Sequence, residues 1–377
     1  MIDISKLIYG EETSGDELRY VKGIHKRPVV VWNSTKTCNL NCVHCYSDSD
    51  ACLYPGELLT EEAKALIKDL ADFKAPVFLF SGGEPFIRKD LFELIDFTVN
   101  SGIRAVISTN GTLISKDTAK RLKDSKVAYV GISLDGIGEV NDKFRGKKGA
   151  FKMAVAGFRN CVDAGVKVGL RLTLTKHNCE NLPGIFDFIE AEKINRACFY
   201  HLVYSGRGGG MVKDDLTHDE TRKAIDYIIE RSGKLRNVDI LTVDNHTDGV
   251  YIYKKLKEKD PARARKVLEL LKINAGNSSG RGIACVDNLG NIYADQFWKQ
   301  HTYGNVHKDK FSKLWQNATE PVLAALGDRK KLLKGKCAVC NYVDICNGNF
   351  RVRAEAVYND PWQEDPSCYL TREEVTS

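Results

Sequence analysis

An alternation of strand and helix patterns between residue 29 and about residue 232 restricts the fold more than any other feature. Alternating strands and helices imply parallel strands joined by right-handed crossovers. Six strands are too few to close an eight-stranded barrel, so the pattern predicts an α/β fold, a partial (β/α)6 barrel with functional loops at the carboxyl ends of its strands. The predicted strands are 29–33, 77–80, 104–109, 128–134, 166–175 and 197–203, and the predicted helices are 60–73, 90–100, 115–124, 150–164 and 182–192.

Three cysteines, Cys38, Cys42 and Cys45, stand on a tight loop after the first predicted strand. Iron–sulfur clusters are normally held by four cysteines, so three thiolates leave one iron open to a substrate or cofactor. A structural zinc site requires four closed ligands. His44 is the nearby candidate for the fourth, but its ring would turn inward only with difficulty. The spacing favours a [4Fe–4S] cluster with an open iron over a zinc half-site.

The cysteine spacing resembles the motif of the radical S-adenosylmethionine (SAM) enzymes. The resemblance implies that SAM chelates the open iron and that an electron from the cluster cleaves it to a 5′-deoxyadenosyl radical. One strand later, Gly82 and Gly83 allow a ligand to approach the backbone closely, and Glu84 offers an acceptor for an ammonium group. This string is similar to the superfamily motif that binds the amino group of SAM. A plain strand–helix turn is the alternative.

The same resemblance implies further SAM contacts. It places the SAM ribose and carboxylate against polar residues at the ends or inner faces of later strands, and adenine against residues that flank Cys45. The residues in these places are His44, Tyr46, Asn110, Ser133, Asp135 and Arg171. Turn residues and helix N-caps are the alternative for the polar residues at the strand ends.

A second cysteine set lies near the C-terminus and consists of Cys337, Cys340, Cys346 and Cys368. Four thiolates close a site completely, which suits either a structural zinc ion or a second iron–sulfur cluster. The spacing resembles the SPASM-type extension of radical SAM enzymes and thereby implies an auxiliary [4Fe–4S] cluster. Phe350 stands where the full pattern has another cysteine, and only Cys285 is an upstream candidate. We therefore expect one auxiliary cluster.

These features predict four regions: an N-terminal extension (1–28), the partial barrel (29–235), a bridging region with a hairpin (236–325) and a small cysteine-rich auxiliary-cluster domain (326–377). Further helices are expected near 218–232 and 261–272, and the hairpin strands at 283–287 and 291–295. The Gly-rich stretch 205–213 lacks the ending of a phosphate-binding loop. It is expected to be a flexible loop that closes over the substrate mouth.

Nearly the whole chain resembles the radical SAM enzymes of alternative haem and haem d1 biosynthesis, through strings such as 199–208, 244–249 and 360–370. The resemblance is greatest to the didecarboxysiroheme deacetylase type, which implies removal of acetate side chains to give iron-coproporphyrin. Removal of propionate side chains, as in haem d1 synthesis, is the near alternative. A polyanionic tetrapyrrole favours cationic and polar side chains at the cavity mouth, and histidine also ligates haem iron. The candidates are His201, Tyr204, Arg207 and His246.

Two other functions compete with this one. A peptide maturase of the SPASM type would need a leader-binding domain, for which the residues before the first strand are too few. A non-catalytic iron–sulfur carrier would need neither an open iron nor the Gly-Gly-Glu-Pro string. For His201, a buried hydrogen-bonded histidine is the alternative, and for His246 a surface residue.

The composition restricts the location of the protein and the class of partner that it binds. No run reaches the roughly 20 apolar residues of a membrane span, and no signal peptide is evident, so a cytoplasmic protein is expected. Twelve cysteines in such a chain favour metal ligation over disulfides. The net charge of +6 comes without a long basic run, which argues against nucleic-acid binding. The expected partners are the tetrapyrrole and an electron donor such as ferredoxin or flavodoxin.

Overall fold

The structure is a computed structural model that describes residues 1–10, 16–21 and 27–377, and both gaps fall in the predicted N-terminal extension. The described residues form an 11-stranded sheet in the order β1-β8-β7-β6-β5-β4-β3-β2-β9-β10-β11. The strands are β1 (Ile2–Asp3), β2 (Val29–Thr35), β3 (Val77–Gly82), β4 (Arg104–Thr109), β5 (Tyr129–Ser133), β6 (Val168–Leu174), β7 (Arg196–His201), β8 (Asp239–Val243), β9 (Ile283–Val286), β10 (Asn291–Tyr293) and β11 (Thr302–Asn305).

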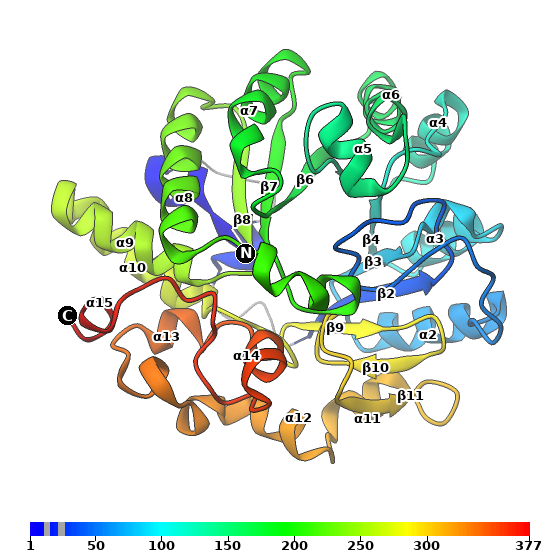
Figure 1. Ribbon diagram of the computed structural model, residues 1–377. Coiled ribbons are helices and arrows are strands. Elements are labelled where there is room, and N and C mark those ends of the chain that lie inside the picture. The colour runs from blue at the N-terminus through cyan, green and yellow to red at the C-terminus, as the bar shows by residue number, and fades with distance from the viewer. Residues whose placement is uncertain (11–15, 22–26) are drawn as a thin grey trace.

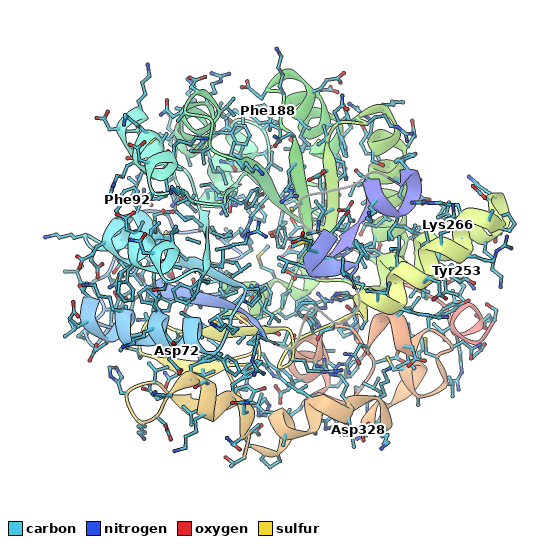
Figure 2. The ribbon with its side chains drawn as sticks, turned by 180° about the vertical axis from the view of Figure 1, so that it is seen from behind. Asp72, Phe92, Phe188, Tyr253, Lys266 and Asp328 are labelled. Atoms are coloured by element: carbon cyan, nitrogen blue, oxygen red, sulfur yellow. The ribbon has the colours of Figure 1, made fainter. Side chains whose placement is uncertain are left out.

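The six predicted parallel strands correspond to β2–β7 and pair with one another in chain order. Their apolar runs are buried because helices cover the outer face of the curved sheet. Figure 1 shows α2, α3, α4, α6, α7 and α8 arranged around that face, and Figure 2 shows the same layer from behind, with Phe92 of α3 and Phe188 of α7 near its edge. The α/β fold with a parallel-strand sheet is therefore confirmed.

The sheet extends beyond the predicted strands. β8 continues the parallel set beside β7, and β1 pairs with it in the antiparallel sense. The predicted hairpin is present as β9 and β10. β9 also joins the barrel sheet, because it pairs in parallel with β2. The hairpin is thus an extension of the barrel wall on the side where the cysteine loop begins.

The helices surround the sheet and form the C-terminal region. The α-helices are α1 (Asp16–Arg19), α2 (Thr60–Asp72), α3 (Leu91–Asn100), α4 (Lys116–Asp124), α5 (Glu139–Arg145), α6 (Ala150–Asp163), α7 (Leu182–Ala191), α8 (His218–Lys234), α9 (Thr247–Lys259), α10 (Pro261–Asn274), α11 (Phe311–Gln316), α12 (Pro321–Ala325), α13 (Val343–Cys346), α14 (Arg351–Tyr358) and α15 (Arg372–Thr376). Within the described ranges, no helix is long and apolar enough to cross a membrane.

The Gly-rich stretch differs from its prediction. Instead of a flexible loop, it forms the 3-10 helix η4 (Gly206–Asp214), in which Gly206 has a positive φ of 55° and Met211 departs from helical backbone angles. The stretch is anchored because Gly206 packs directly on the backbone of Cys45 and Tyr46, where a Cβ atom would lie 2.5 Å from the Cys45 carbonyl oxygen. Glycine is therefore required at this close approach, and η4 braces the cysteine loop.

Candidate active site

The cysteine loop after β2 borders a large cavity inside the curved sheet. Cys38, Cys42 and Cys45 all contribute to the wall of this cavity, whose volume is about 1200 Å³. Backbone donors face two of the sulfurs: the Leu40 N–H is 3.5 Å from Cys38 Sγ, and the Ser49 N–H is 3.4 Å from Cys45 Sγ. Donors of this kind orient and stabilise thiolates that ligate a metal.

Arg145, the last residue of α5, supplies a charged donor to the same loop. Its Nη1 lies 3.6 Å from Cys42 Sγ, and its Nη2 forms an ion pair with Asp135. Asp135 is fully buried and accepts a hydrogen bond of 2.7 Å from the Thr173 N–H. It does not border the cavity. Asp135 thus holds Arg145 against the cysteine loop. Nothing local in the sequence marks Arg145, because Cys42 is 103 residues away.

Gly82 and Gly83 bring the end of β3 against the strand that leads into the cysteine loop. The Gly83 N–H donates to the Thr35 carbonyl at 2.7 Å, and the Glu84 N–H donates to the Thr37 carbonyl at 3.0 Å. A Cβ atom on Gly83 would lie 2.1 Å from that Thr37 oxygen. Only glycine allows this approach. Both glycines border the cavity, as expected for residues that contact a bound ligand.

Glu84 faces the next strand. Its carboxylate is fully buried and accepts hydrogen bonds from Thr109 Oγ1 at 2.7 Å and from the Asn110 N–H at 2.9 Å. Burial raises the pKa of Glu84 to about 7, against the opposing effect of these hydrogen bonds. Glu84 is not part of the cavity wall. In this structure the carboxylate ties β3 to β4.

Three of the predicted SAM contacts line the cavity together. Asn110 Nδ2 is 3.9 Å from Cys38 Sγ, which places Asn110 beside the cysteine loop. Ser133 and Arg171 are register partners on β5 and β6, and both reach the cavity. A Cβ atom on Gly131 would lie 2.1 Å from Arg171 Nε. The glycine leaves the space in which the guanidinium crosses the sheet.

The two residues that flank Cys45 also border the cavity. His44 packs on Phe144, with ring centroids 4.6 Å apart, and burial lowers the pKa of His44 to about 4. Its imidazole is therefore neutral at pH 7. Tyr46 Oη donates a hydrogen bond of 3.0 Å to Asn33 Oδ1. Both rings are fixed against the wall, next to the loop that carries the cysteines.

The four predicted substrate residues divide into two pairs. His201 and His246 border the cavity, whereas Tyr204 and Arg207 do not. Tyr204 Oη donates to Asp215 at 2.7 Å. Arg207 braces the cysteine loop, because its Nε donates to the Cys42 carbonyl at 2.8 Å. The placement of Tyr204 and Arg207 at the cavity mouth is therefore corrected: η4 turns them toward other partners.

The two histidines at the cavity are held in different ways. His201 Nε2 is 2.9 Å from Asp248 Oδ2, and the other oxygen of Asp248 accepts from Tyr369 Oη at 2.7 Å. The His246 ring lies nearly parallel to Phe350, with centroids 6.2 Å apart. Burial lowers the pKa of His246 well below its ordinary value. His246 is therefore neutral, the form in which histidine binds metals.

The C-terminal cysteines face one small cavity. Cys337, Cys340, Cys346 and Cys368 all border the same cavity. Beside them lies Arg351, 1% exposed, which makes hydrogen bonds to carbonyls and no ion pair with a described carboxylate. Across the described ranges, no three His, Cys, Asp or Glu side chains converge closely enough for a single metal ion. The four thiols nevertheless share a site next to a buried positive charge.

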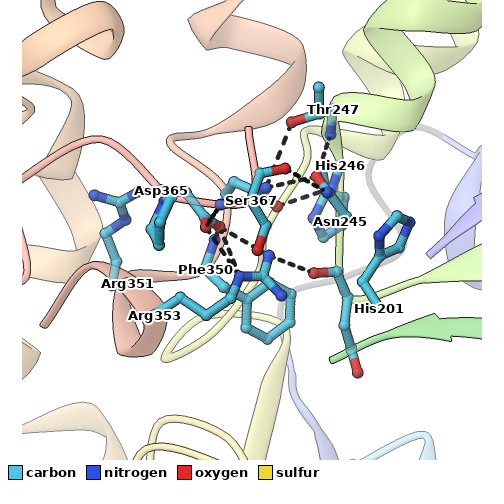
Figure 3. A network of polar contacts seen from close by, with 12 residues as sticks. His201, Asn245, His246, Thr247, Phe350, Arg351, Arg353, Asp365 and Ser367 are labelled. Carbon is cyan, nitrogen blue, oxygen red and sulfur yellow. Dashed lines mark hydrogen bonds and ion pairs between the residues drawn. The ribbon is translucent and has the colours of Figure 1, made fainter. Parts of the chain in front are cut away.

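Arg353, a member of a buried ion pair inside this C-terminal region, joins the region to the barrel, as Figure 3 shows. Arg353 and Asp365 are fully buried, with Nη2 and Oδ2 2.8 Å apart. Arg353 also donates to the carbonyls of Leu202 at 3.1 Å and Asp244 at 2.7 Å, which directly follow β7 and β8. The Cys368 N–H donates to the Asp365 carbonyl at 2.9 Å. One side-chain pair therefore fixes the fourth cysteine to the strand ends that carry the histidines.

Comparison with known proteins agrees with this geometry. Residues 32–189, which span β2 through most of α7, match the Radical SAM superfamily. Over its full length the chain is 53% identical to the Fe-coproporphyrin III synthase of Methanosarcina barkeri, of which it covers 99%. The chain belongs to the radical SAM superfamily. It is also 40% identical to the pre-heme d1 synthase of Dinoroseobacter shibae, over 95% of this chain and 89% of that protein.

The fold is likewise that of a radical SAM enzyme. The structure of Streptococcus suis SuiB bound to S-adenosylmethionine superposes with a TM-score of 0.72, at 19% identity, over 92% of this chain and 78% of that one. Superfamily membership implies a [4Fe–4S] cluster and SAM, and the site fits both. Three thiols border one cavity, and buried polar atoms without a hydrogen-bond partner adjoin it, among them His44 Nδ1 and Arg171 Nε.

Proposed function

We propose that this radical SAM enzyme removes acetate side chains from didecarboxysiroheme and gives iron-coproporphyrin in alternative haem biosynthesis. The observation that carries the proposal is the full-length similarity to a protein named Fe-coproporphyrin III synthase. The cavity supports it, because about 1200 Å³ exceeds the 300–1,000 Å³ typical of small-molecule sites and leaves room for SAM and a large second ligand. Bound together, the cluster and SAM supply a radical that abstracts hydrogen from an unactivated carbon.

The residues at the cavity wall take separate roles in this proposal. Cys38, Cys42 and Cys45 hold the cluster, and the adjoining polar wall of Asn110, Ser133 and Arg171 binds SAM. His201 and His246 stand at the ends of β7 and β8 and face the tetrapyrrole. His246 is our candidate ligand for its iron, because its Nδ1 is buried without a hydrogen-bond partner. The reaction needs a one-electron donor of the ferredoxin or flavodoxin type. We propose that the protein lies in the cytoplasm.

An anaerobic assay tests the proposal. The reconstituted protein is incubated with didecarboxysiroheme, SAM and dithionite, and the products are read by mass spectrometry. We expect 5′-deoxyadenosine and the loss of two acetate side chains. Cys42→Ala should abolish SAM cleavage, and Cys52→Ala should not, because Cys52 is exposed and lies outside both cysteine sets. SAM cleavage with an unchanged tetrapyrrole would exclude this substrate.

Removal of propionate side chains is the second candidate. The 40% identity to a pre-heme d1 synthase supports it. The same assay separates the two reactions, because loss of propionate side chains gives a different product mass from loss of acetate side chains. A product of the propionate mass would transfer the chain to the haem d1 branch and leave the radical chemistry unchanged.

We also propose that Cys337, Cys340, Cys346 and Cys368 hold an auxiliary [4Fe–4S] cluster. Their shared cavity supports this, as does the buried charge of Arg351, which four thiolates around a cluster would offset. We expect about eight irons per chain, since each [4Fe–4S] cluster holds four. Cys368→Ala should lower iron to about four while the SAM-binding cluster keeps its electron paramagnetic resonance signal. Cys179→Ala is the control. Zinc in place of the second set of irons would contradict the proposal.

A further inference from the structure

A lysine-rich segment, residues 143–148, is fixed against the outside of the cysteine loop. The Val43 N–H donates to the Phe144 carbonyl at 3.0 Å, and the Asn41 N–H donates to the Arg145 carbonyl at 3.3 Å. Figure 1 shows the end of α5 beside the dark-blue loop that follows β2. These two backbone hydrogen bonds make the segment and the loop one surface.

Two further contacts hold the segment in place. Lys147 Nζ donates to the Asn39 carbonyl at 3.4 Å. Gly146 packs so tightly that a Cβ atom would lie 2.4 Å from the Asn41 carbonyl oxygen. Together with the contact between Arg145 and Cys42 Sγ, these place the segment within one residue of a cluster ligand. The position of its charges relative to the cluster is therefore defined by the fold.

The surface so formed is positively charged around an apolar centre. Lys143, Lys147 and Lys148 are exposed, and Val43, next to Cys42, is 41% exposed. Among the described residues, none of the three lysines forms an ion pair, and none borders the large cavity. On the neighbouring loop, Asp48 is paired with Arg207 at 3.1 Å, and Asp50 accepts hydrogen bonds from the Cys52 N–H and Tyr54 Oη. Asp142, next to Lys143, accepts hydrogen bonds from the N–H groups of Gly149 and Phe151. The three lysines thus carry unpaired positive charges, lie outside the substrate cavity, and surround the point where the cysteine loop reaches the surface.

A radical SAM enzyme takes one electron into its cluster for each reductive cleavage of SAM. We propose that Val43 and the segment 143–148 form the docking surface for a small acidic one-electron carrier protein. The carrier loses one electron and the cluster gains it, with no bond or proton transferred in this step. Opposite charges steer such an encounter and align the partners. The inference rests on the radical SAM chemistry alone and not on the identity of the tetrapyrrole.

Charge reversal tests the docking surface. The triple variant Lys143→Glu/Lys147→Glu/Lys148→Glu is compared with the parent enzyme in SAM cleavage driven by photoreduced flavodoxin and, separately, by dithionite. With flavodoxin we expect the KM for the carrier to rise at least about tenfold and its dependence on salt to weaken. With dithionite, which is small and needs no docking surface, we expect the rate and the tetrapyrrole product to stay unchanged.

A matched control carries the same change in net charge elsewhere. Lys257, Lys259 and Lys266 are exposed on α9 and α10, and Figure 2 shows Lys266 on the outer side of the molecule. Their triple change to glutamate should leave the KM for flavodoxin unchanged. An equal rise in this control would overturn the proposal in favour of a general charge effect. Unchanged flavodoxin kinetics in the first variant would overturn it outright.

A second variant separates docking from folding, because Lys147 contacts the cysteine loop. Lys143→Glu/Lys148→Glu leaves that contact in place and should still raise the KM for flavodoxin, with a normal iron content and cluster absorbance. A fall in dithionite-driven cleavage that equals the fall with flavodoxin, in protein with a full cluster, would mean that the segment supports the site and not the carrier. Failure of the tetrapyrrole assay with dithionite in the parent enzyme would bear on the proposed substrate only.

Discussion

Replacing Arg353 with methionine is expected to destabilise the protein by about 3–5 kcal/mol, the usual cost of removing one partner from a buried ion pair. The loss is large because Asp365 is fully buried and would keep an unpaired charge. The carbonyls of Leu202 and Asp244 would also lose their donor. The midpoint of urea unfolding, followed anaerobically by tryptophan fluorescence, measures the effect. The KM for the tetrapyrrole should rise as well, since Leu202 directly follows His201 and Asp244 lies two residues before His246.

Two comparison variants identify the cause of that destabilisation. In Arg353→Met/Asp365→Leu neither member of the pair leaves an unpaired buried charge, so stability should partly recover. Recovery should stop short of the parent, because the two carbonyls still lack a donor and the N–H groups of Phe350 and Ser367 lose their acceptor. Each unsatisfied group costs about 1–3 kcal/mol. Arg159→Met removes an exposed ion pair with Glu192 and should cost at most about 1 kcal/mol. If Arg353→Met cost no more than Arg159→Met, Arg353 would not hold the two regions together.

The parts of the fold that follow from local patterns could be predicted. Strands β2–β7 are buried apolar runs separated by amphipathic helices. The apolar run of a strand and the periodic pattern of a helix can each be recognised within one short stretch of sequence. β8 (Asp239–Val243) was not among the predicted strands. α9 was hidden because its first half is buried and contains Gly249. A Cβ atom there would lie 2.7 Å from Leu271 of α10, so the glycine serves close helix packing that only the tertiary structure reveals.

The candidate site likewise contains parts that could be predicted from the sequence and parts that could not. The cysteine loop and the glycine pair are each a short contiguous stretch of sequence at the end of a strand. Their position next to one cavity could therefore be anticipated. The contact of Arg145 with Cys42 spans 103 residues, and that of Arg353 with Asp244 spans 109. Such pairs depend on the tertiary arrangement and leave no local pattern. Tyr204 and Arg207 were placed at the cavity because of their neighbours in sequence, but the turn into η4 directs them elsewhere.

Gly83→Ala should raise the Kd for SAM at least about tenfold, which corresponds to about 1.4 kcal/mol of binding free energy. The backbone of Gly83 has no positive φ, so alanine meets no conformational strain and the effect is purely steric. Its Cβ would lie 2.1 Å from the Thr37 carbonyl oxygen, and a backbone atom cannot rotate away as a flexible side chain can.

The displacement must therefore pass to Thr37, the residue before Cys38, or to the end of β3 itself. Either shift moves the glycine pair relative to the cysteine loop, the two elements between which SAM has to fit. Equilibrium titration of the cluster-loaded protein with SAM measures the effect. Gly327→Ala is the matched control, because a Cβ there meets nothing within 4 Å. A Kd for Gly83→Ala equal to that of the control would show that the close approach at Gly83 is not needed for SAM binding.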